Sequence, residues 1–269
     1  MQKYAERRAA LLAELDGLSV EIEPEKGVAY LILDRPPLNI VSYRARAQIA
    51  ALFEEFGRDD EVRVVVVRGA GGVYTSGADV KAFPDIHRDG MSHLAWNIAA
   101  AERCPKPVIC AIEKYAFGVG FELAMACDFR FATEESKLGL PEVSIGQIPG
   151  SGGSHRLARI AGLTRAKEVC MLAKRMSAKE ALDWGVVTKV VADSAALDAA
   201  IEEAVTTLTR QSPLALTTVK RVLNTAYDTS LAVGHEVEGH AYEKLRDSED
   251  YNEGIAAFAE KRKADYKGR

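Results

Sequence analysis

Two glutamates stand in apolar surroundings beside glycine-rich turns, a pattern that suits paired acid–base groups. Glu122 ends the run Tyr115-Ala-Phe-Gly-Val-Gly-Phe-Glu122, and Glu142 lies at the start of a glycine-rich segment that reaches Gly153. Burying a carboxylate without a partner is costly, so carboxylates in such places are frequently functional. Glycines permit tight turns, and amides at a helix start point outward toward a polarised oxygen. The pair predicts acid–base chemistry beside an anion-binding turn.

A second turn, Ser76-Gly-Ala-Asp-Val-Lys81, offers another cluster of backbone amides. Alone it reads as an ordinary strand-to-helix loop. Together with the turn at 118–120 it supplies two amide groups that can converge on one carbonyl oxygen as an oxyanion hole. The turn at 118–120 lacks the third glycine of a dinucleotide fingerprint and the lysine of a phosphate loop. Alternatively, Glu122 serves only the helix dipole, and Glu142 forms a salt bridge with Arg130 or Arg156.

Histidines and cysteines give no comparable signal. His155 does not lie in a nucleophile motif of the GxSxG type, and His235 and His240 are five residues apart, not the four of a metal-binding helix pair. The cysteines show neither metal-ligand nor disulfide spacing, which favours free thiols in a reducing compartment. We therefore predict no metal site. The four cysteines are Cys104, Cys110, Cys127 and Cys170.

The composition is that of a water-soluble enzyme. The chain has 269 residues, 48% hydrophobic content and a net charge of −4, so it has no general basic surface for nucleic acid or an anionic membrane. Charged residues interrupt the apolar residues of the first 18 positions, which argues against a signal peptide. No apolar run approaches the length of a transmembrane helix. We expect a cytoplasmic protein with neither nucleic-acid nor membrane partners.

The hydrophobic pattern predicts that strands and helices alternate through the first half of the chain. Strands are expected at 28–33, 62–67, 107–112 and 128–132, and helices at 3–18, around Ile49–Phe56, at 91–103 and at 120–127. After residue 150 the pattern is mainly helical, with a strand at 186–191. Ser177 and Glu180 fit a capping box.

Two regions follow from this order of elements. Residues 1–195 are expected to form an α/β core with an N-terminal helix, and residues 196–269 a helical region. No low-complexity linker separates them. Amphipathic helices must bury their apolar faces, so the helical region is expected to cover the core or another subunit.

Four motifs occur in order at family-like spacings, and together they resemble those of the crotonase (enoyl-CoA hydratase/isomerase) family. The resemblance runs from about residue 20 to the C-terminus. The motifs are Ser76-Gly-Ala-Asp-Val-Lys81; Lys106-Pro-Val-Ile-Cys-Ala-Ile112 with Gly118-Val-Gly-Phe-Glu122-Leu-Ala-Met-Ala-Cys-Asp128; Pro141-Glu142 with Gly146-Gln-Ile-Pro-Gly-Ser-Gly-Gly153; and Ala257-Phe-Ala-Glu-Lys-Arg-Lys263.

The resemblance implies an α/β fold of the crotonase type, a spiral of ββα turns with a C-terminal helical region. That region would pack against neighbouring subunits, as a homotrimer or a dimer of trimers. It also implies an acyl-CoA thioester as substrate, with coenzyme A as part of the substrate and no separate cofactor. Because this chain keeps both family glutamates, the implied activity is that of an enoyl-CoA hydratase, a hydro-lyase of fatty acid metabolism and β-oxidation.

The resemblance also assigns roles to single residues. Glu122 would orient and deprotonate water, and Glu142 would donate a proton to the α-carbon. The backbone amides of Ser76 and Val119 would hold the thioester oxygen as it becomes an enolate. The amide of Gly150 would position the water.

Coenzyme A would lie along two further segments. Its adenine is expected near Ala78, Asp79 and Val80, and Phe258 and Lys261 of a neighbouring subunit would approach its nucleotide end. Other chemistries of the family stay open: double-bond isomerisation, a hydratase/lyase reaction or thioester hydrolysis. A non-catalytic CoA-binding oligomer is the alternative outside catalysis.

The chain departs from the family at the second turn. Val119 stands where the family commonly has glycine, and Phe121 is larger than the residue often found there. A valine resists positive φ and narrows the space beside the thioester. We expect these two positions to affect the choice of acyl group.

Overall fold

The computed structural model describes residues 2–85 and 93–269. Within them, six strands form the main sheet in the order β1-β2-β3-β4-β6-β9. The strand β1 runs antiparallel to β2, and the following neighbours are parallel. The bounds are β1 Leu18–Glu23, β2 Val28–Leu33, β3 Val64–Gly69, β4 Val108–Ile112, β6 Phe129–Thr133 and β9 Lys189–Val191. A smaller sheet joins β5 (Tyr115–Phe117), β7 (Lys137–Gly139) and β8 (Met176–Ser177).

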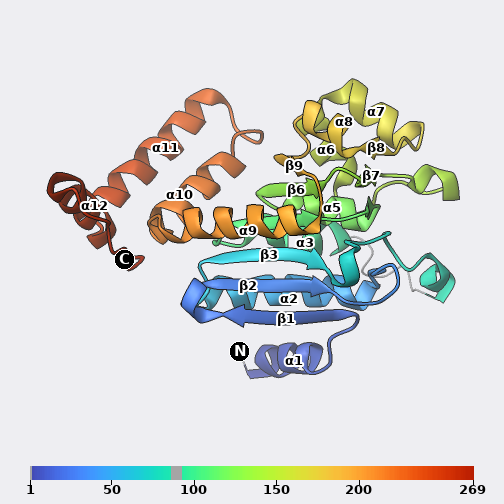
Figure 1. Ribbon diagram of the computed structural model, residues 1–269, viewed down its shortest axis with the longest axis horizontal. Helices are drawn as coiled ribbons and strands as arrows, with labels where there is room; N and C mark the ends of the chain where they lie inside the picture. Colours follow the sequence, from blue (N-terminus) through green and yellow to red (C-terminus); the bar gives the residue numbers. More distant parts are fainter. Residues whose placement is uncertain (1, 86–92) are drawn as a thin grey trace.

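The central strands β3 and β4 are buried on both faces, because successive side chains point to opposite sides and helices cover each side. Val65 belongs to the same buried cluster as Phe53 of helix α2 (Tyr43–Arg58). Its neighbour Val66 belongs to a second cluster with Leu197 of helix α9 (Ser194–Thr209). Figure 1 shows α2 and α9 on either side of the central strands. A run of four valines in β3 therefore serves two cores at once.

The remaining helices of the core pack either on α2 or around the smaller sheet. They are α1 Gln2–Leu12, α3 Leu94–Ile98, α4 Ala100–Arg103, α5 Val119–Ala126, α6 Gly153–Ala161, α7 Leu163–Met171 and α8 Ala178–Asp183. The capping box predicted at Ser177 and Glu180 is present at the start of α8, with both reciprocal hydrogen bonds. Single 3-10 turns are η1 Pro24–Lys26, η2 Ala70–Gly72, η3 Val80–Asp85 and η5 Glu142–Ile145.

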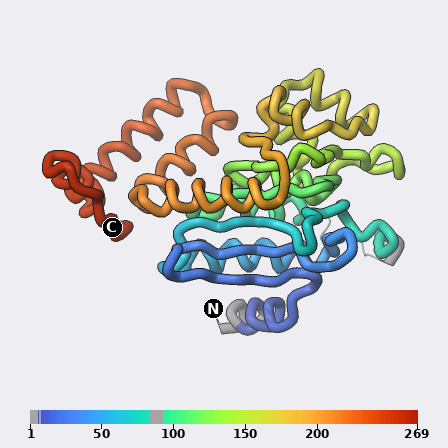
Figure 2. Tube along the Cα trace, viewed as in Figure 1, coloured from blue at the N-terminus to red at the C-terminus, as the bar shows by residue number. Residues whose placement is uncertain are grey.

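The last helices extend away from the sheet. In Figures 1 and 2, α11 (Leu231–Arg246) and α12 (Glu249–Glu260) project beyond the edge of the core, whereas α10 (Pro213–Asn224) is hydrogen-bonded to it. The division expected between residues 195 and 196 falls just inside α9, which packs on the sheet. Among the described residues, no helix has the length and apolar character needed to cross a membrane.

Several predicted boundaries were wrong. The helix expected at 3–18 ends at Leu12, and the strand β1 begins at Leu18 after Gly17, whose φ of 65° does not fit a helix. The helix expected at 91–103 is divided into α3 and α4, and residues 91 and 92 lie outside the described residues. The strand expected at 186–191 is regular only from Lys189.

Candidate active site

The first predicted glutamate is held by two amides of a distant loop. Glu122 lies in the first turn of α5 and is 2% exposed. Its Oε1 accepts hydrogen bonds from the backbone N–H groups of Ser151 at 2.8 Å and Gly153 at 2.9 Å. A side chain at position 153 would clash, because its Cβ would lie 2.8 Å from Glu122 Cγ. The glycine-rich segment therefore seats this carboxylate in a fixed orientation.

The second glutamate is positioned by the 3-10 turn η5, which it begins. Burial raises the pKa of Glu142 to about 7, and the nearby charge of Glu122 also raises it, whereas its own backbone N–H and Arg46 lower it. Its Oε2 is buried and has no hydrogen-bond partner among the described residues. A carboxyl group with a near-neutral pKa suits a proton donor at physiological pH.

The two glutamates share one site with the second glycine turn. Gly118, with φ of 52°, precedes α5 and turns the chain. A Cβ at this position would lie 3.2 Å from Glu142 Oε1, so Glu142 lies against the turn that leads to Glu122. The N–H of Val119, at the start of α5, donates no hydrogen bond within the described part of the chain. This turn therefore offers an unoccupied amide next to both carboxylates.

In the turn that begins at Ser76, the predicted role of the Ser76 amide was wrong. The N–H of Ser76 donates to the carbonyl oxygen of Leu38 at 2.9 Å, so this amide is already occupied. The N–H of Ala78, two residues on, has no partner within residues 2–85 and 93–269. Gly77, with φ of 112°, packs against the second turn, since a Cβ there would lie 3.0 Å from the carbonyl oxygen of Phe117. Ala78, not Ser76, is the free donor of this turn.

The backbone strain expected at Val119 is absent, whereas the influence of Val119 and Phe121 on the acyl group stays a prediction. The positive φ of the turn is at Gly118, whereas Val119 is the first helical residue of α5. The side chains of Val119 and Phe121 are 3% and 0% exposed and belong to the main hydrophobic core. The valine is therefore not strained by positive φ.

The other predicted positions are spread over the molecule. Gly150 is exposed in the loop before Ser151, and a Cβ there would meet nothing within 4 Å. Asp79 Oδ2 lies 4.0 Å from Arg35 Nη1, and Val80, which begins η3, is 47% exposed.

Two further predicted positions lie at the far end of the chain. Phe258 of α12 is 87% exposed, and Lys261 caps that helix with φ of 56°. Figure 1 shows α12 at the far left of the molecule, well away from α5, which lies in the interior. The single chain does not bring these two residues to its own glutamates, and their role in a neighbouring subunit stays a prediction.

Arg46 of α2 is a charged group of the site that the sequence analysis did not identify. It is 4% exposed, its guanidinium carbon lies 4.7 Å from the centre of the Tyr43 ring, and its Nη1 donates to Ser151 Oγ at 3.3 Å. Burial lowers the pKa of Arg46, while the charge of Glu122 raises it. A signal was available, because position 46 shares the helix face of Ile49 and is charged in an apolar stripe.

The structural partners considered for Glu142 are engaged elsewhere. Arg130 donates to the carbonyl oxygens of Val186 and Cys127, and Arg156 pairs with Glu102. The salt bridges considered from the sequence are therefore not formed.

The thiols are free, as predicted. Cys170 of α7 faces the site, and burial, with the charges of Glu142 and Glu122, raises its pKa. Within the described residues, no group of histidine, cysteine or carboxylate side chains is arranged to hold a metal ion.

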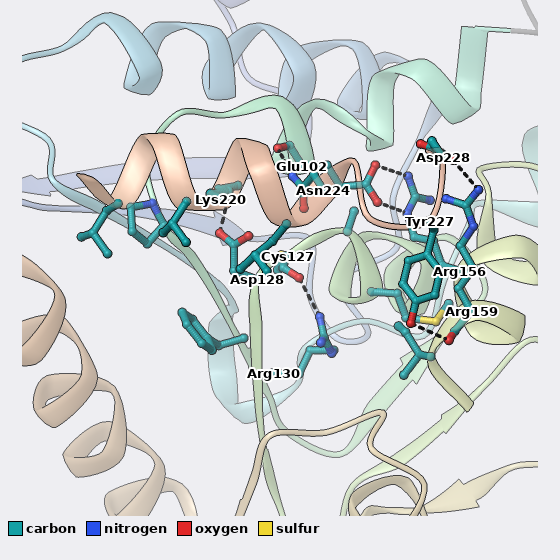
Figure 3. A pocket seen from close by; sticks show the side chains of 18 of the residues that line it. Glu102, Cys127, Asp128, Arg130, Arg156, Arg159, Lys220, Asn224, Tyr227 and Asp228 are labelled. Atoms are coloured by element: carbon teal, nitrogen blue, oxygen red, sulfur yellow. Dashed lines mark hydrogen bonds and ion pairs between the residues drawn. The ribbon is translucent and has the colours of Figure 1, made fainter. Parts of the chain in front are cut away.

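A cavity of about 460 Å³ lies elsewhere, between α10 and the core (Figure 3). Neither glutamate of the site lines it. Its charged side chains pair with one another: Lys220 with Asp128, Arg156 with Glu102, and Arg159 with Asp228. Two of these pairs attach α10 and the segment after it to the core. Because these described side chains are engaged in ion pairs, the cavity is a poorer candidate for acid–base catalysis than the site with the two glutamates.

Comparison with known proteins points to one family. The sequence pattern of the enoyl-CoA hydratase/isomerase family matches residues 23–269. A probable enoyl-CoA hydratase of Bacillus subtilis (strain 168) is 35% identical over 259 residues, which cover 93% of this chain and 99% of the relative. A carnitinyl-CoA dehydratase of Proteus mirabilis is 33% identical over 259 residues, with coverage of 93% and 99%.

Solved structures agree with the sequence comparison. The crystal structure of an enoyl-CoA hydratase from Bacillus anthracis superposes with a TM-score of 0.88 at 33% identity, covering 94% of this chain and all of that one. A putative enoyl-CoA hydratase from Streptomyces coelicolor has the same TM-score at 32% identity, with coverage of 95% and 96%.

Proposed function

The chain belongs to the enoyl-CoA hydratase/isomerase family, with the mixed α/β crotonase fold, and from this premise we propose that it is an enoyl-CoA hydratase. In this reaction water adds across the α,β double bond of a 2-enoyl-CoA thioester. The observation that carries the proposal is the pair of carboxylates in one site with different environments. Glu122 is fixed by two amides, and Glu142 has a pKa raised to about 7.

The proposed reaction begins with the thioester oxygen between the free amides of Ala78 and Val119. The Glu122 carboxylate takes a proton from water as the water oxygen bonds to the β-carbon. The π electrons of the double bond move through the α-carbon onto the thioester oxygen, and the two N–H groups stabilise the resulting enolate. The enolate collapses as Glu142 gives its proton to the α-carbon. Proton transfer from Glu122 to Glu142 through solvent then restores both groups.

The environments of the two groups fit these tasks. A donor must be protonated before the reaction, and burial, which favours the neutral form, keeps a large share of Glu142 protonated near neutral pH. The base must be oriented, and Oε1 of Glu122 is fixed by the N–H groups of Ser151 and Gly153. When the surroundings of two carboxyl groups favour different protonation states, one group can serve as the acid and the other as the base.

The substrate and assembly follow from the same premise. The acyl group would be carried by coenzyme A, with its adenine near Ala78 to Val80 and no separate cofactor. Phe258 and Lys261 of a neighbouring subunit would complete the nucleotide end, in a homotrimer or a dimer of trimers in the cytoplasm. The large exposed side chains on α11 and α12 support such contacts.

The reverse reaction on a hydroxylated acyl group is the second candidate. Relatives named carnitinyl-CoA dehydratase match nearly the full length of the chain. Dehydration uses the same two carboxylates with the proton transfers reversed, so the geometry serves either direction.

A panel of acyl-CoA esters tests the proposal. The purified protein should remove the conjugated thioester absorbance of at least one straight, branched or cyclic 2-enoyl-CoA and give a product heavier by one water. A product of unchanged mass would indicate isomerisation, and free coenzyme A would indicate hydrolysis. Consumption of none of the esters would contradict catalytic function, and retained CoA binding would then favour a non-catalytic role.

A further inference from the structure

We propose that Arg46 is a positioning residue of the hydration reaction. It holds Ser151 beside Glu122, and its positive charge stabilises the negative forms of the two carboxylates between which a proton passes. This inference rests on the function proposed above and deepens it. It gives the site a third charged group, contributed by α2, in addition to those of α5 and η5.

Two hydrogen bonds connect Arg46 through Ser151 to Glu122. Arg46 Nη1 donates to Ser151 Oγ at 3.3 Å, and the backbone N–H of Ser151 donates to Glu122 Oε1 at 2.8 Å. Ser151 is fully buried and is held from a third side by Arg156, which donates to its carbonyl oxygen at 2.7 Å. A displacement of Ser151 would therefore move one of the two amides that orient the base.

The buried guanidinium of Arg46 has few direct hydrogen-bond acceptors among the described residues. The Arg46 side chain has five N–H donors, but among the described residues its one hydrogen-bond acceptor is Ser151 Oγ, and its buried Nε has none. It forms no ion pair with a described residue within 4.0 Å. Burying an arginine in this way is costly unless nearby negative charge compensates. The compensation comes from Glu122 and Glu142, which both favour the charged guanidinium.

Three charged or titratable groups near Glu142 come from three different helices. Glu122 from α5 repels its negative form and Arg46 from α2 stabilises it, while Cys170 from α7 is half-buried and favours the neutral thiol, because partial burial and the two carboxylates raise its pKa. The ring of Tyr43 lies against the guanidinium, with its centre 4.7 Å from the guanidinium carbon. Arg46 is therefore the positive charge among these groups, and its removal should keep Glu142 protonated to higher pH.

The test compares pH profiles of kcat/KM for a 2-enoyl-CoA that the wild-type protein hydrates. In Arg46→Met the alkaline limb, which follows loss of the Glu142 proton, should move to higher pH. Each unit of movement leaves about tenfold more relative activity on the falling side of the profile. Arg46→Lys keeps the charge but loses the hydrogen bond from Nη1 to Ser151 Oγ, so its limb should stay in place while kcat falls. Arg44→Met, an exposed position on the same helix, should match the wild type.

An infrared titration gives a readout that does not depend on turnover. The carboxylic acid band that Glu142→Gln removes should persist to higher pH in Arg46→Met than in wild type. A rate loss of equal size at every pH, with an unchanged band titration, would overturn the inference and leave Arg46 a structural residue. If Arg46→Met does not fold, a limb shift in Arg46→Lys would also overturn it. If no enoyl-CoA is hydrated, the proposed function fails while the infrared titration still decides the influence of Arg46.

Discussion

Glu122 and Glu142 have the same side chain and different surroundings, and the surroundings assign their tasks. Two backbone amides orient Glu122, whereas Glu142 has a buried oxygen without a described partner and a pKa raised to about 7 by burial. A carboxyl group buried without compensating hydrogen bonds favours its neutral form. The base is thus the oriented group, and the acid is the desolvated one.

Burial of Glu142 should make the free energy of unfolding depend on pH. Between its ordinary pKa of 4.5 and about 7, the unfolded chain releases this proton while the folded chain retains it. The free energy of unfolding therefore falls as pH rises through this window. Glutamine cannot ionise, so Glu142→Gln should gain melting temperature relative to wild type near pH 8 and gain little near pH 5. Thermal unfolding of both proteins at both pH values checks this, and an equal difference at both would contradict it.

The free amide of Val119 can be removed without a long-range change. Val119 is the first residue of α5, where proline fits the backbone and its missing N–H breaks no helical bond. Val119→Pro should lower kcat by about 10²–10³ relative to Val119→Ala, the usual effect of one lost oxyanion donor. Circular dichroism should show both variants folded. Equal rates in the two variants would remove this amide from the mechanism.

At the residue level, sequence reasoning identified what local context reveals. A charge inside an apolar run marked Glu122 and Glu142. The choice between the amides of Ser76 and Ala78 could not be made, because it depends on the carbonyl of Leu38, which lies in another loop. Arg46 was missed because its carboxylate neighbours come from distant segments.

At the level of elements, long and strongly patterned segments were predicted well. The strands β2, β3, β4 and β6 lie within two residues of their predicted bounds, because β-branched runs buried on both faces have few alternatives. The strand β1 and the three short strands of the smaller sheet were missed. Strands of two or three residues, such as β8, carry too little pattern and exist through their neighbours.

A buried lysine contributes to the attachment of helix α10 to the core. Lys220 Nζ lies 2.7 Å from Asp128 Oδ2 and donates to the carbonyl oxygens of Ala101 and Lys106, each at 3.0 Å. Lys220→Met would leave the Asp128 carboxylate without its counter-charge and remove the donor to two carbonyls, at a cost of about 3–5 kcal/mol in the free energy of unfolding. Urea unfolding measures this loss. Arg221→Met, an exposed neighbour, is the control, and a similar small change in both variants would contradict this attachment.

For the whole molecule, the C-terminal helices are the part whose surroundings a single chain does not complete. Leu231, Tyr242 and Phe258 on α11 and α12 are 76%, 62% and 87% exposed. Clustered large apolar side chains on a surface usually mark an interaction site. The sequence predicted these helices but could not place their partners, since assembly geometry is not encoded in local periodicity. We expect the helices to be covered by neighbouring subunits.

Lys261 offers a test of the CoA site across subunits. Its neighbour Arg262 is paired with Glu253, whereas Lys261 is exposed and has φ of 56°, a conformation that glycine adopts easily. Lys261→Gly should raise KM for an enoyl-CoA about tenfold, the worth of one charge-assisted hydrogen bond. KM for the matching pantetheine thioester, which lacks the nucleotide, should not change. Lys263→Ala is the control, and an equal effect on both thioesters would contradict a nucleotide contact.

The central claim is that two glutamates divide the proton transfers of hydration. Its most direct test is kcat for hydration of a 2-enoyl-CoA by wild type, Glu122→Gln and Glu142→Gln, measured from the loss of conjugated thioester absorbance. Each amide replacement should lower kcat at least about 100-fold while binding of the CoA ester changes little. Full turnover in Glu142→Gln would contradict the account and favour another reaction of the family.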